Sequence, residues 1–226
     1  VDHATPAYRR NNACWITANK TCWPAWNSWA GNQIASGCAI TPKHMIFATH
    51  ATPIVGSTLR FVTNSNAIIT RTVAELVYTG TPDITIAELD SALPGTITPA
   101  KVLPTDWGDY LSIGSCPVIC GNQSMHLMLR EWHSYTSAPQ YFPTEPIKLK
   151  TSEASNRLVV TEEVVSGDSG SPVYVLIDGQ LVILGCHWTA LGCPFITTHI
   201  TEINAAIAAS GYSLTPIDLT AYPNYG

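Results

Sequence analysis

The stretch Gly167–Gln180 has the sequence GDSGSPVYVLIDGQ, and it predicts a tight turn, a strand and a second turn in succession. Valine, tyrosine and isoleucine fill the run Pro172–Ile177, as is typical of strands. Asp178-Gly179 then separates this run from the next one, Gln180–His187. Because an Asp-Gly pair between two apolar runs is a strong hairpin signal, the stretch favours a fold of antiparallel hairpins.

Similar short β-rich runs recur through most of the 226-residue chain. They are Gln33–Ile40, Met45–Thr49, Thr58–Val62, Ala67–Thr72, Ile84–Leu89, Pro117–Cys120 and Arg157–Thr161. Helical periodicity is clear only at Thr201–Ser210, where Ile203, Ala206 and Ile207 share one face and Gly211 follows as a cap. This pattern predicts an all-β barrel or sandwich with one C-terminal helix.

Composition excludes several classes of protein. Charged residues make up 12% of the chain and hydrophobic residues 46%, which is enough apolar surface to exclude a disordered protein. The formal net charge of −5 offers phosphate groups no attraction, so we expect no nucleic-acid partner. No stretch approaches the ~18 apolar residues needed to span a bilayer, so we expect no membrane partner either.

The chain has an odd number of cysteines, seven: Cys14, Cys22, Cys38, Cys116, Cys120, Cys186 and Cys193. Exported proteins tend to pair their cysteines, so we expect a disulfide between Cys14 and Cys22 and at least one unpaired thiol. Zinc held by Cys116, Cys120, Cys186, His187 and Cys193 is an alternative, but their irregular spacing favours disulfides or buried thiols. We therefore expect no metal or other cofactor, and a processed protein that is secreted or, alternatively, part of a viral polyprotein.

Ser169 is the candidate nucleophile of the chain. It lies in the hexamer Gly167–Pro172, where flanking glycines permit a tight turn that exposes backbone amides. The amides of Gly167 and Ser169 are then placed to form an oxyanion hole. A glycine- and serine-rich surface loop is the alternative interpretation of this hexamer.

A serine nucleophile requires a base, and His50 is the candidate. It ends the apolar run MIFATHA, and a neutral imidazole there can take and return the serine proton. His44 is a competitor, although its TPKH context indicates a turn, and a structural role is the alternative for His50 itself. Asp83, at the start of DITIAEL, is the candidate carboxylate that orients His50. Asp90 is the second choice. The alternative interpretation of Asp83 is a structural turn residue after Pro82.

These segments resemble those of the chymotrypsin/trypsin superfamily of serine proteases. The chain order His50, Asp83, Ser169 is that of the superfamily, and ATHA, DITIAEL and GDSGSP resemble its AAHC, DIxLLxL and GDSGGP segments. The resemblance runs from about Ile34 to Ser210. It implies two six-stranded antiparallel barrels with the site between them: residues 1–105 would carry His50 and Asp83, and residues 106–226 would carry Ser169, the helix and the tail.

Three features depart from the superfamily pattern. Ala51 replaces the cysteine that usually follows the histidine. The N-terminus is Val1-Asp2-His3-Ala4, so we do not expect the activating insertion of a terminal amine beside Asp168. The third departure is the substrate-binding segment, where Gly185–Trp188 resembles the G-x-H-W stretch of bacterial glutamyl endopeptidases.

His187 and Glu163 imply two opposed specificities. In the glutamyl enzymes the matching histidine, here His187, meets an acidic P1 side chain. Glu163 matches a position at the pocket base of trypsin-like enzymes, where an acid favours basic P1 residues; a core role for His187 is the alternative. Trp188, Thr189 and Ala190 are expected to offer their backbone to the substrate as an added strand.

The sequence thus predicts a serine endopeptidase that acts on polypeptides, its own precursor or a polyprotein among them. The alternatives are a catalytically silent binding protein with the same fold and an esterase that uses the same three residues.

Overall fold

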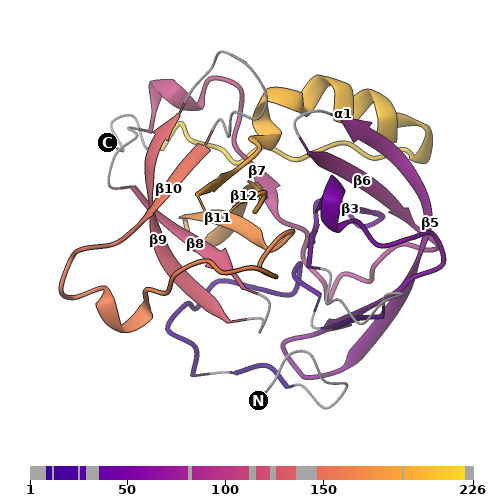
Figure 1. Ribbon diagram of the computed structural model, residues 1–226. Coiled ribbons are helices and arrows are strands. Elements are labelled where there is room, and N and C mark those ends of the chain that lie inside the picture. The colour runs from indigo at the N-terminus through magenta and orange to yellow at the C-terminus, as the bar shows by residue number, and fades with distance from the viewer. Residues whose placement is uncertain are drawn as a thin grey trace.

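The computed structural model of the chain describes residues 9–11, 13–24, 26–28, 36–80, 83–111, 116–122, 126–135, 147–189 and 191–221. Its strands form two sheets, and the chain completes the first before it enters the second (Figure 1). The strands curl into a half-barrel, as Figure 1 shows. In this described part no helix is long and apolar enough to cross a membrane.

The first sheet has the strand order β1-β4-β5-β6-β3-β2, with every pairing antiparallel. Its strands are β1 (Trp26–Ser28), β2 (Cys38–Ala39), β3 (His44–Ala48), β4 (Thr58–Val62), β5 (Ile68–Gly80) and β6 (Ile84–Leu89). Every residue of β3 is buried, because both of its faces are covered. A 3₁₀ turn, η1 (Thr49–Ala51), follows β3 directly.

The second sheet has the order β13-β10-β9-β8-β11-β12-β7. Its strands are β7 (Lys101–Val102), β8 (Cys116–Gly121), β9 (Leu127–Tyr135), β10 (Ile147–Thr151), β11 (Pro172–Ile177), β12 (Gln180–Cys186) and β13 (Gly192–Cys193). The hairpin predicted between β11 and β12 is confirmed. Asp178 and Gly179 adopt φ angles of 48° and 67°, the left-handed backbone that a two-residue hairpin turn requires.

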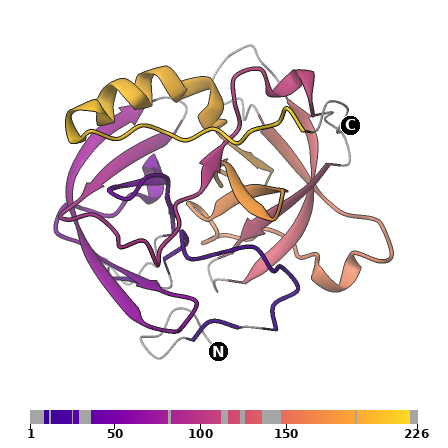
Figure 2. The same cartoon turned by 180° about the vertical axis from the view of Figure 1, so that it is seen from behind.

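The C-terminal helix α1 (Ile200–Ile207) lies against the first sheet, beside β5 (Figure 1). Its apolar face buries Ile203 and Ile207 in the core of that sheet. The predicted cap is confirmed, since Gly211 follows the 3₁₀ turn η5 (Ala208–Ser210) with a φ of 78°. The next segment crosses from the first sheet to the second, as Figure 2 shows from behind.

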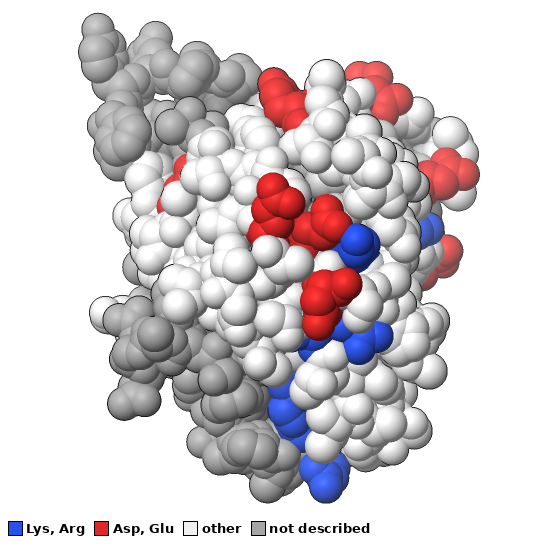
Figure 3. All heavy atoms as spheres, turned by 90° about the vertical axis from the view of Figure 1, so that its right-hand side faces the viewer, with Lys and Arg blue, Asp and Glu red and all other residues white. Residues whose placement is uncertain are grey.

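Two apolar clusters form the core. The first contains β3 and β6, and the second contains an aromatic group in which Trp107 stacks on Trp132 at 5.2 Å and meets Phe195 edge-on at 5.4 Å. Tyr174 of β11 joins the two halves, because it is fully buried in the first cluster although its strand belongs to the second sheet. Figure 3 shows the β5 side of the surface, where most of the described area is uncharged and charged side chains of both signs are spread from top to bottom.

The structure confirms the predicted β-rich class with its C-terminal helix, and it differs in two places. Arg157–Thr161 is not a strand: it holds the 3₁₀ turn η3 (Leu158–Val160), and Val159 is 90% exposed because no neighbouring strand pairs with it. The six cysteines with described side chains form no disulfide, so the predicted Cys14–Cys22 bond is absent. Cys22 instead faces the core, where its Sγ lies 3.7 Å from the Tyr174 hydroxyl.

The sequence also missed five of the described strands: the short strands β1, β7 and β13, and the longer strands β9 and β10. In β9 the adjacent charged residues Arg130 and Glu131 interrupt a simple alternation of apolar and polar residues, whereas β10, with the sequence IKLKT, keeps that alternation over only five residues. In β9 both Arg130 and Glu131 are buried, one on each face, so the strand lacks the polar face that would reveal it.

Candidate active site

His50 and Asp83 contact each other at the ends of two neighbouring strands. Ala48, the last residue of β3, pairs with Ile84, the first residue of β6. The turn that follows β3 therefore lies beside Asp83, which precedes β6. His50 Nδ1 lies 2.8 Å from Asp83 Oδ2, and the His50 backbone N–H donates to Asp83 Oδ1 at 3.0 Å. The carboxylate therefore fixes both the ring and the backbone of the histidine.

The backbone of Asp83 itself is unusual. Its φ is 91°, in the left-handed region that aspartate and asparagine adopt more readily than other side chains do. The Thr49 N–H donates to the Asp83 carbonyl at 3.3 Å, and the Thr85 hydroxyl donates to the Thr49 hydroxyl at 3.0 Å. The Asp83 side chain is 9% exposed and that of His50 is 41% exposed, so a buried acid supports a base that faces solvent.

The loop that carries Ser169 is closed by its own hydrogen bonds. Buried Asp168 accepts the Val165 N–H at Oδ2 (2.8 Å), and its backbone carbonyl accepts the Ser171 N–H at 3.0 Å. Gly167 and Gly170 have φ angles of 101° and 79°, so the turn needs glycine on both sides of Ser169. Ser169 is half-buried at the head of this turn.

The Ser169 loop packs directly against the residue that follows His50. A Cβ placed on Gly170 would lie 3.1 Å from Ala51 Cβ and 2.9 Å from the Ser36 carbonyl oxygen. The residues that follow Ser169 and His50 are therefore in contact. The structure thus places the loop that carries Ser169 against the turn that carries His50, although the two adjoin strands of different sheets.

The amides of Gly167 and Ser169 are available to a ligand. Within the described part of the chain, neither N–H donates to another residue. Their neighbours differ, because the Gly170 N–H donates to the His187 carbonyl at 2.9 Å and the Asp168 N–H donates to Val165 at 3.1 Å. Such unoccupied amides beside a serine are what an oxyanion hole requires.

His187 lies directly beneath this loop. Its N–H donates to the Ser171 carbonyl at 2.8 Å, and its side chain is fully buried. Burial, with a smaller contribution from the nearby charge of Arg130, lowers the pKa of His187 to about 3, although the backbone of Gly192 and Thr189 opposes this shift. The ring is therefore neutral at neutral pH.

Glu163 lies at the surface rather than under the loop, with its side chain 76% exposed. Its Oε1 accepts the Thr151 hydroxyl at 2.8 Å, and its Oε2 lies 3.9 Å from Arg130 Nη1. Arg130, on β9, was not predicted from the sequence. The available signal is a permanent cation within the apolar run LMLREW.

Of the predicted substrate-binding strand, Trp188 and Thr189 are described and Ala190 lies outside the described residues. The Trp188 N–H donates to the Gly192 carbonyl at 3.1 Å, and Thr189 forms a bridge with Gly192. Trp188 is half-buried and Thr189 is exposed, so this segment borders the surface next to His187.

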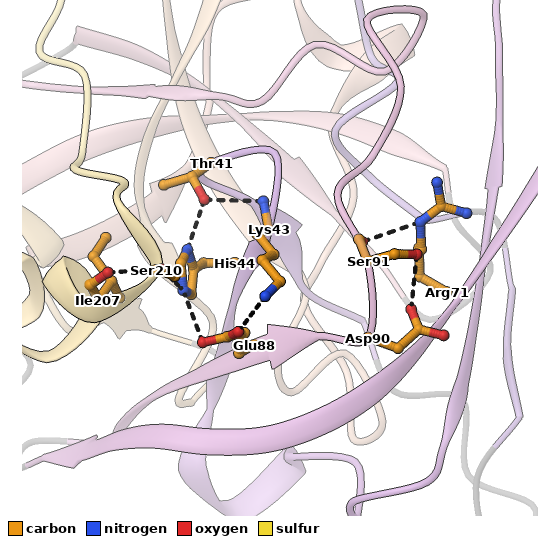
Figure 4. Close-up of polar contacts among 9 residues, drawn as sticks. All are labelled: Thr41, Lys43, His44, Arg71, Glu88, Asp90, Ser91, Ile207 and Ser210. Atoms are coloured by element: carbon orange, nitrogen blue, oxygen red, sulfur yellow. Dashed lines mark hydrogen bonds and ion pairs between the residues drawn. The ribbon is translucent and has the colours of Figure 1, made fainter.

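The competing residues His44 and Asp90 lie elsewhere (Figure 4). His44 is not in a turn but begins β3, fully buried, with Nδ1 2.7 Å from the Thr41 hydroxyl and Nε2 3.1 Å from the Ser210 hydroxyl. Asp90 is exposed and accepts the Ser91 hydroxyl at 3.4 Å. Neither contacts His50 or the Ser169 loop.

Among the described residues, no group of three or more histidine, cysteine, aspartate or glutamate side chains could hold a metal ion. In comparisons with known proteins, the chain matches no family model and no curated protein.

Proposed function

We propose that the chain is a serine endopeptidase with Ser169 as nucleophile, His50 as base and Asp83 as the residue that orients the base. The observation that carries the proposal is the double contact of Asp83 with His50, at 2.8 and 3.0 Å, beside the loop of Ser169. A buried carboxylate that holds an exposed imidazole next to a serine is the arrangement that activates serine hydroxyls.

The proposed reaction is acyl transfer. His50 removes the proton of the Ser169 hydroxyl while Oγ forms a bond to the substrate carbonyl carbon. The developing oxyanion would accept from the Gly167 and Ser169 amides, which have no other acceptor among the described residues. His50 then gives its proton to the leaving amine, and a water activated by His50 hydrolyses the acyl-enzyme.

The two-barrel layout of the chymotrypsin superfamily is part of this proposal. Its support is the division into two mainly antiparallel sheets, with the change of sheet between Leu89 and Lys101. A location outside the cell is a further proposal, and the absence of a disulfide among the described cysteines gives it no support.

A fluorophosphonate probe and a diverse peptide library test the proposal on the wild type, Ser169→Ala and Ser171→Ala. We expect labelling and cleavage by the wild type, the loss of both in Ser169→Ala, and labelling of Ser171→Ala at Ser169. Labelling with ester turnover but no peptide cleavage would favour the esterase. A folded wild-type protein that neither labels nor cleaves would favour the silent binding protein.

A further inference from the structure

Two cysteines from different segments of the chain meet at one buried tyrosine. The Sγ atom of Cys22 lies 3.7 Å from the Tyr174 hydroxyl, and that hydroxyl donates to Cys38 Sγ at 3.2 Å. All three side chains are fully buried in the first apolar cluster. Because both sulfurs contact the same oxygen atom, they cannot be farther apart than these two distances together. The two thiols are therefore neighbours.

The backbones that carry the two cysteines also lie side by side. The Ala39 N–H donates to the Cys22 carbonyl at 2.9 Å, and Ala39 follows Cys38 directly in β2. Extended segments joined by such hydrogen bonds have facing Cα atoms about 4.5–5.5 Å apart. A disulfide requires Cα atoms about 4.4–6.8 Å apart, so this arrangement suits a bond without a large movement of the backbone.

Cys186 belongs to the same apolar cluster and is the alternative partner for Cys38. Its thiol, however, donates to the Ile46 carbonyl at 3.8 Å and so faces β3. The Cys22 side chain interacts with Cys38 instead, since hydrogen bonding by Cys38 lowers the pKa of Cys22 against the effect of burial. These contacts favour Cys22 as the partner of Cys38.

We propose that Cys22 and Cys38 are the site of a disulfide bond, which forms when the chain folds in the presence of a disulfide oxidant such as oxidised glutathione. One cysteine thiolate attacks a sulfur of the oxidant and releases one glutathione thiolate, which leaves a mixed disulfide. The second cysteine thiolate attacks the cysteine sulfur of that mixed disulfide and releases the second glutathione thiolate. Two protein thiols are oxidised and one oxidant disulfide is reduced, and the protons that the cysteines lose equal those that the glutathione thiolates take up.

Burial fixes the stage at which the bond forms and does not oppose the product. Both thiols are fully buried in the folded protein, so the exchange takes place before Cys22 is covered. In the product the Tyr174 hydroxyl keeps the Cys38 sulfur as its acceptor, because this hydrogen bond uses the proton of the tyrosine and not that of a thiol. Oxidation therefore leaves this buried donor satisfied.

The bond would fasten the segment behind the Ser169 loop. Trp23 follows Cys22, and its indole N–H donates to the Ser36 hydroxyl at 2.6 Å. The Ser36 carbonyl oxygen lies 2.9 Å from the place of a Cβ on Gly170, next to Ser169. The disulfide thus adds a covalent link to a segment that already contacts this loop, and it can form whether or not the chain is a peptidase.

Refolding of the full chain from urea in a glutathione redox buffer tests the proposal. Free thiols are then alkylated, and the digested protein is analysed by mass spectrometry. For the wild type we expect a cross-linked peptide pair that joins Cys22 to Cys38, with Cys186 alkylated. The pair should be absent from Cys38→Ser and should persist in Cys186→Ser, the matched control from the same cluster. If a variant fails to fold, the wild-type map decides.

Oxidation of the wild type in concentrated urea separates the effect of the fold from that of sequence distance. Without the fold, loop closure favours the shorter span from Cys14 to Cys22, whereas the folded protein should join Cys22 to Cys38. Closing a loop of about 15 residues should raise the folding equilibrium constant about 100-fold. The oxidised wild type and the oxidised Cys186→Ser protein should therefore both unfold at a higher urea concentration than their reduced forms.

Two results would overturn the proposed bond and leave the proposed peptidase untouched. One is a folded wild-type protein in which Cys22 and Cys38 are both alkylated after refolding with the oxidant. The other is a folded protein that joins Cys22 to Cys14 or Cys38 to Cys186. A Cys22–Cys38 bond that leaves the urea midpoint unchanged would contradict its role in fastening the segment behind the Ser169 loop.

Discussion

Asp83 illustrates how much depends on a single residue. Its carboxylate uses one oxygen for the His50 ring and the other for the His50 N–H, and its backbone holds a left-handed φ of 91°. Asparagine tolerates that backbone but presents an N–H₂ group in place of one oxygen. Replacing Asp83 with asparagine therefore changes the chemistry of the side chain but keeps the backbone conformation.

Asp83→Asn should lower kcat by about 10⁴-fold while the protein stays folded, because the His50 ring is then held in the wrong tautomer. Peptide hydrolysis and circular dichroism measure the two effects. Asp90→Asn is the control, since Asp90 is exposed and contacts Ser91 instead of a histidine. An Asp83→Asn protein with wild-type kcat would exclude Asp83 from the mechanism.

Gly170 and Gly179 form a second residue-scale comparison. Both have left-handed φ angles, 79° and 67°, but a Cβ on Gly170 would meet Ser36 and Ala51, whereas a Cβ on Gly179 meets nothing within 4 Å. Alanine should cost about 1 kcal/mol of backbone strain at either position.

Only Gly170→Ala should also reduce hydrolysis, because the contact with Ala51 would move the Ser169 loop away from His50. Urea unfolding and peptide hydrolysis of both variants measure strain and loop position separately. Equal activity of the two variants would show that the approach of the loop to Ala51 does not matter for the reaction.

At the scale of elements, His44 fastens the turn η5 to β3 (Figure 4). The Ser210 hydroxyl donates to the Ile207 carbonyl at 2.7 Å, so it accepts from His44 Nε2. The Thr41 hydroxyl accepts the Lys43 N–H at 3.1 Å and donates to Nδ1. This chain of hydrogen bonds requires a neutral His44 with its proton on Nε2.

Burial lowers the pKa of His44; nearby Glu88 opposes this shift and Lys43 adds to it. Because the folded pKa is the lower one, the stabilisation by neutral His44 is present in full above the unfolded pKa, about 6.5, and is lost as the pH falls from there through the folded pKa. The wild type should lose free energy of unfolding relative to His44→Gln between pH 7.5 and 5.

The difference should have a slope of at most about 1.4 kcal/mol per pH unit, which corresponds to one proton. Urea unfolding at several pH values checks it. Parallel pH profiles for the two proteins would mean that His44 does not titrate differently on folding.

At the scale of the whole molecule, the segment after α1 joins the two cores. Leu214 is buried in the first cluster, and Ile217 and Leu219 are buried in the second. The backbone of Val102 secures the segment, since it donates to Thr215 at 3.1 Å and accepts from Ile217 at 2.8 Å. The two sheets are thus tied together by a segment that belongs to neither.

Ile217→Ala should cost about 2–5 kcal/mol of unfolding free energy, because it leaves a cavity in the second core. Ile68→Ala is the control, since Ile68 is 48% exposed and its loss should cost about 0.5 kcal/mol or less. Thermal and urea unfolding measure both. A cost for Ile217→Ala no larger than for Ile68→Ala would show that the segment adds little to stability.

The sequence by itself determined the local features of this protein. The strands Thr58–Val62, Ile84–Leu89 and Pro172–Ile177, the Asp178-Gly179 turn and the Gly211 cap follow from β-propensity and turn chemistry, which act between near neighbours. The order of His50, Asp83 and Ser169 along the chain made them candidates for one site.

Only the tertiary structure decided which residues meet. His50 and Asp83 are 33 positions apart and touch because β3 pairs with β6, and Gly170 lies against Ala51 because two sheets pack together. The same packing makes Cys22 face Tyr174 instead of Cys14 and buries Arg130 near His187. Sheet pairing and core packing join residues that are distant in sequence, and no local pattern encodes such contacts.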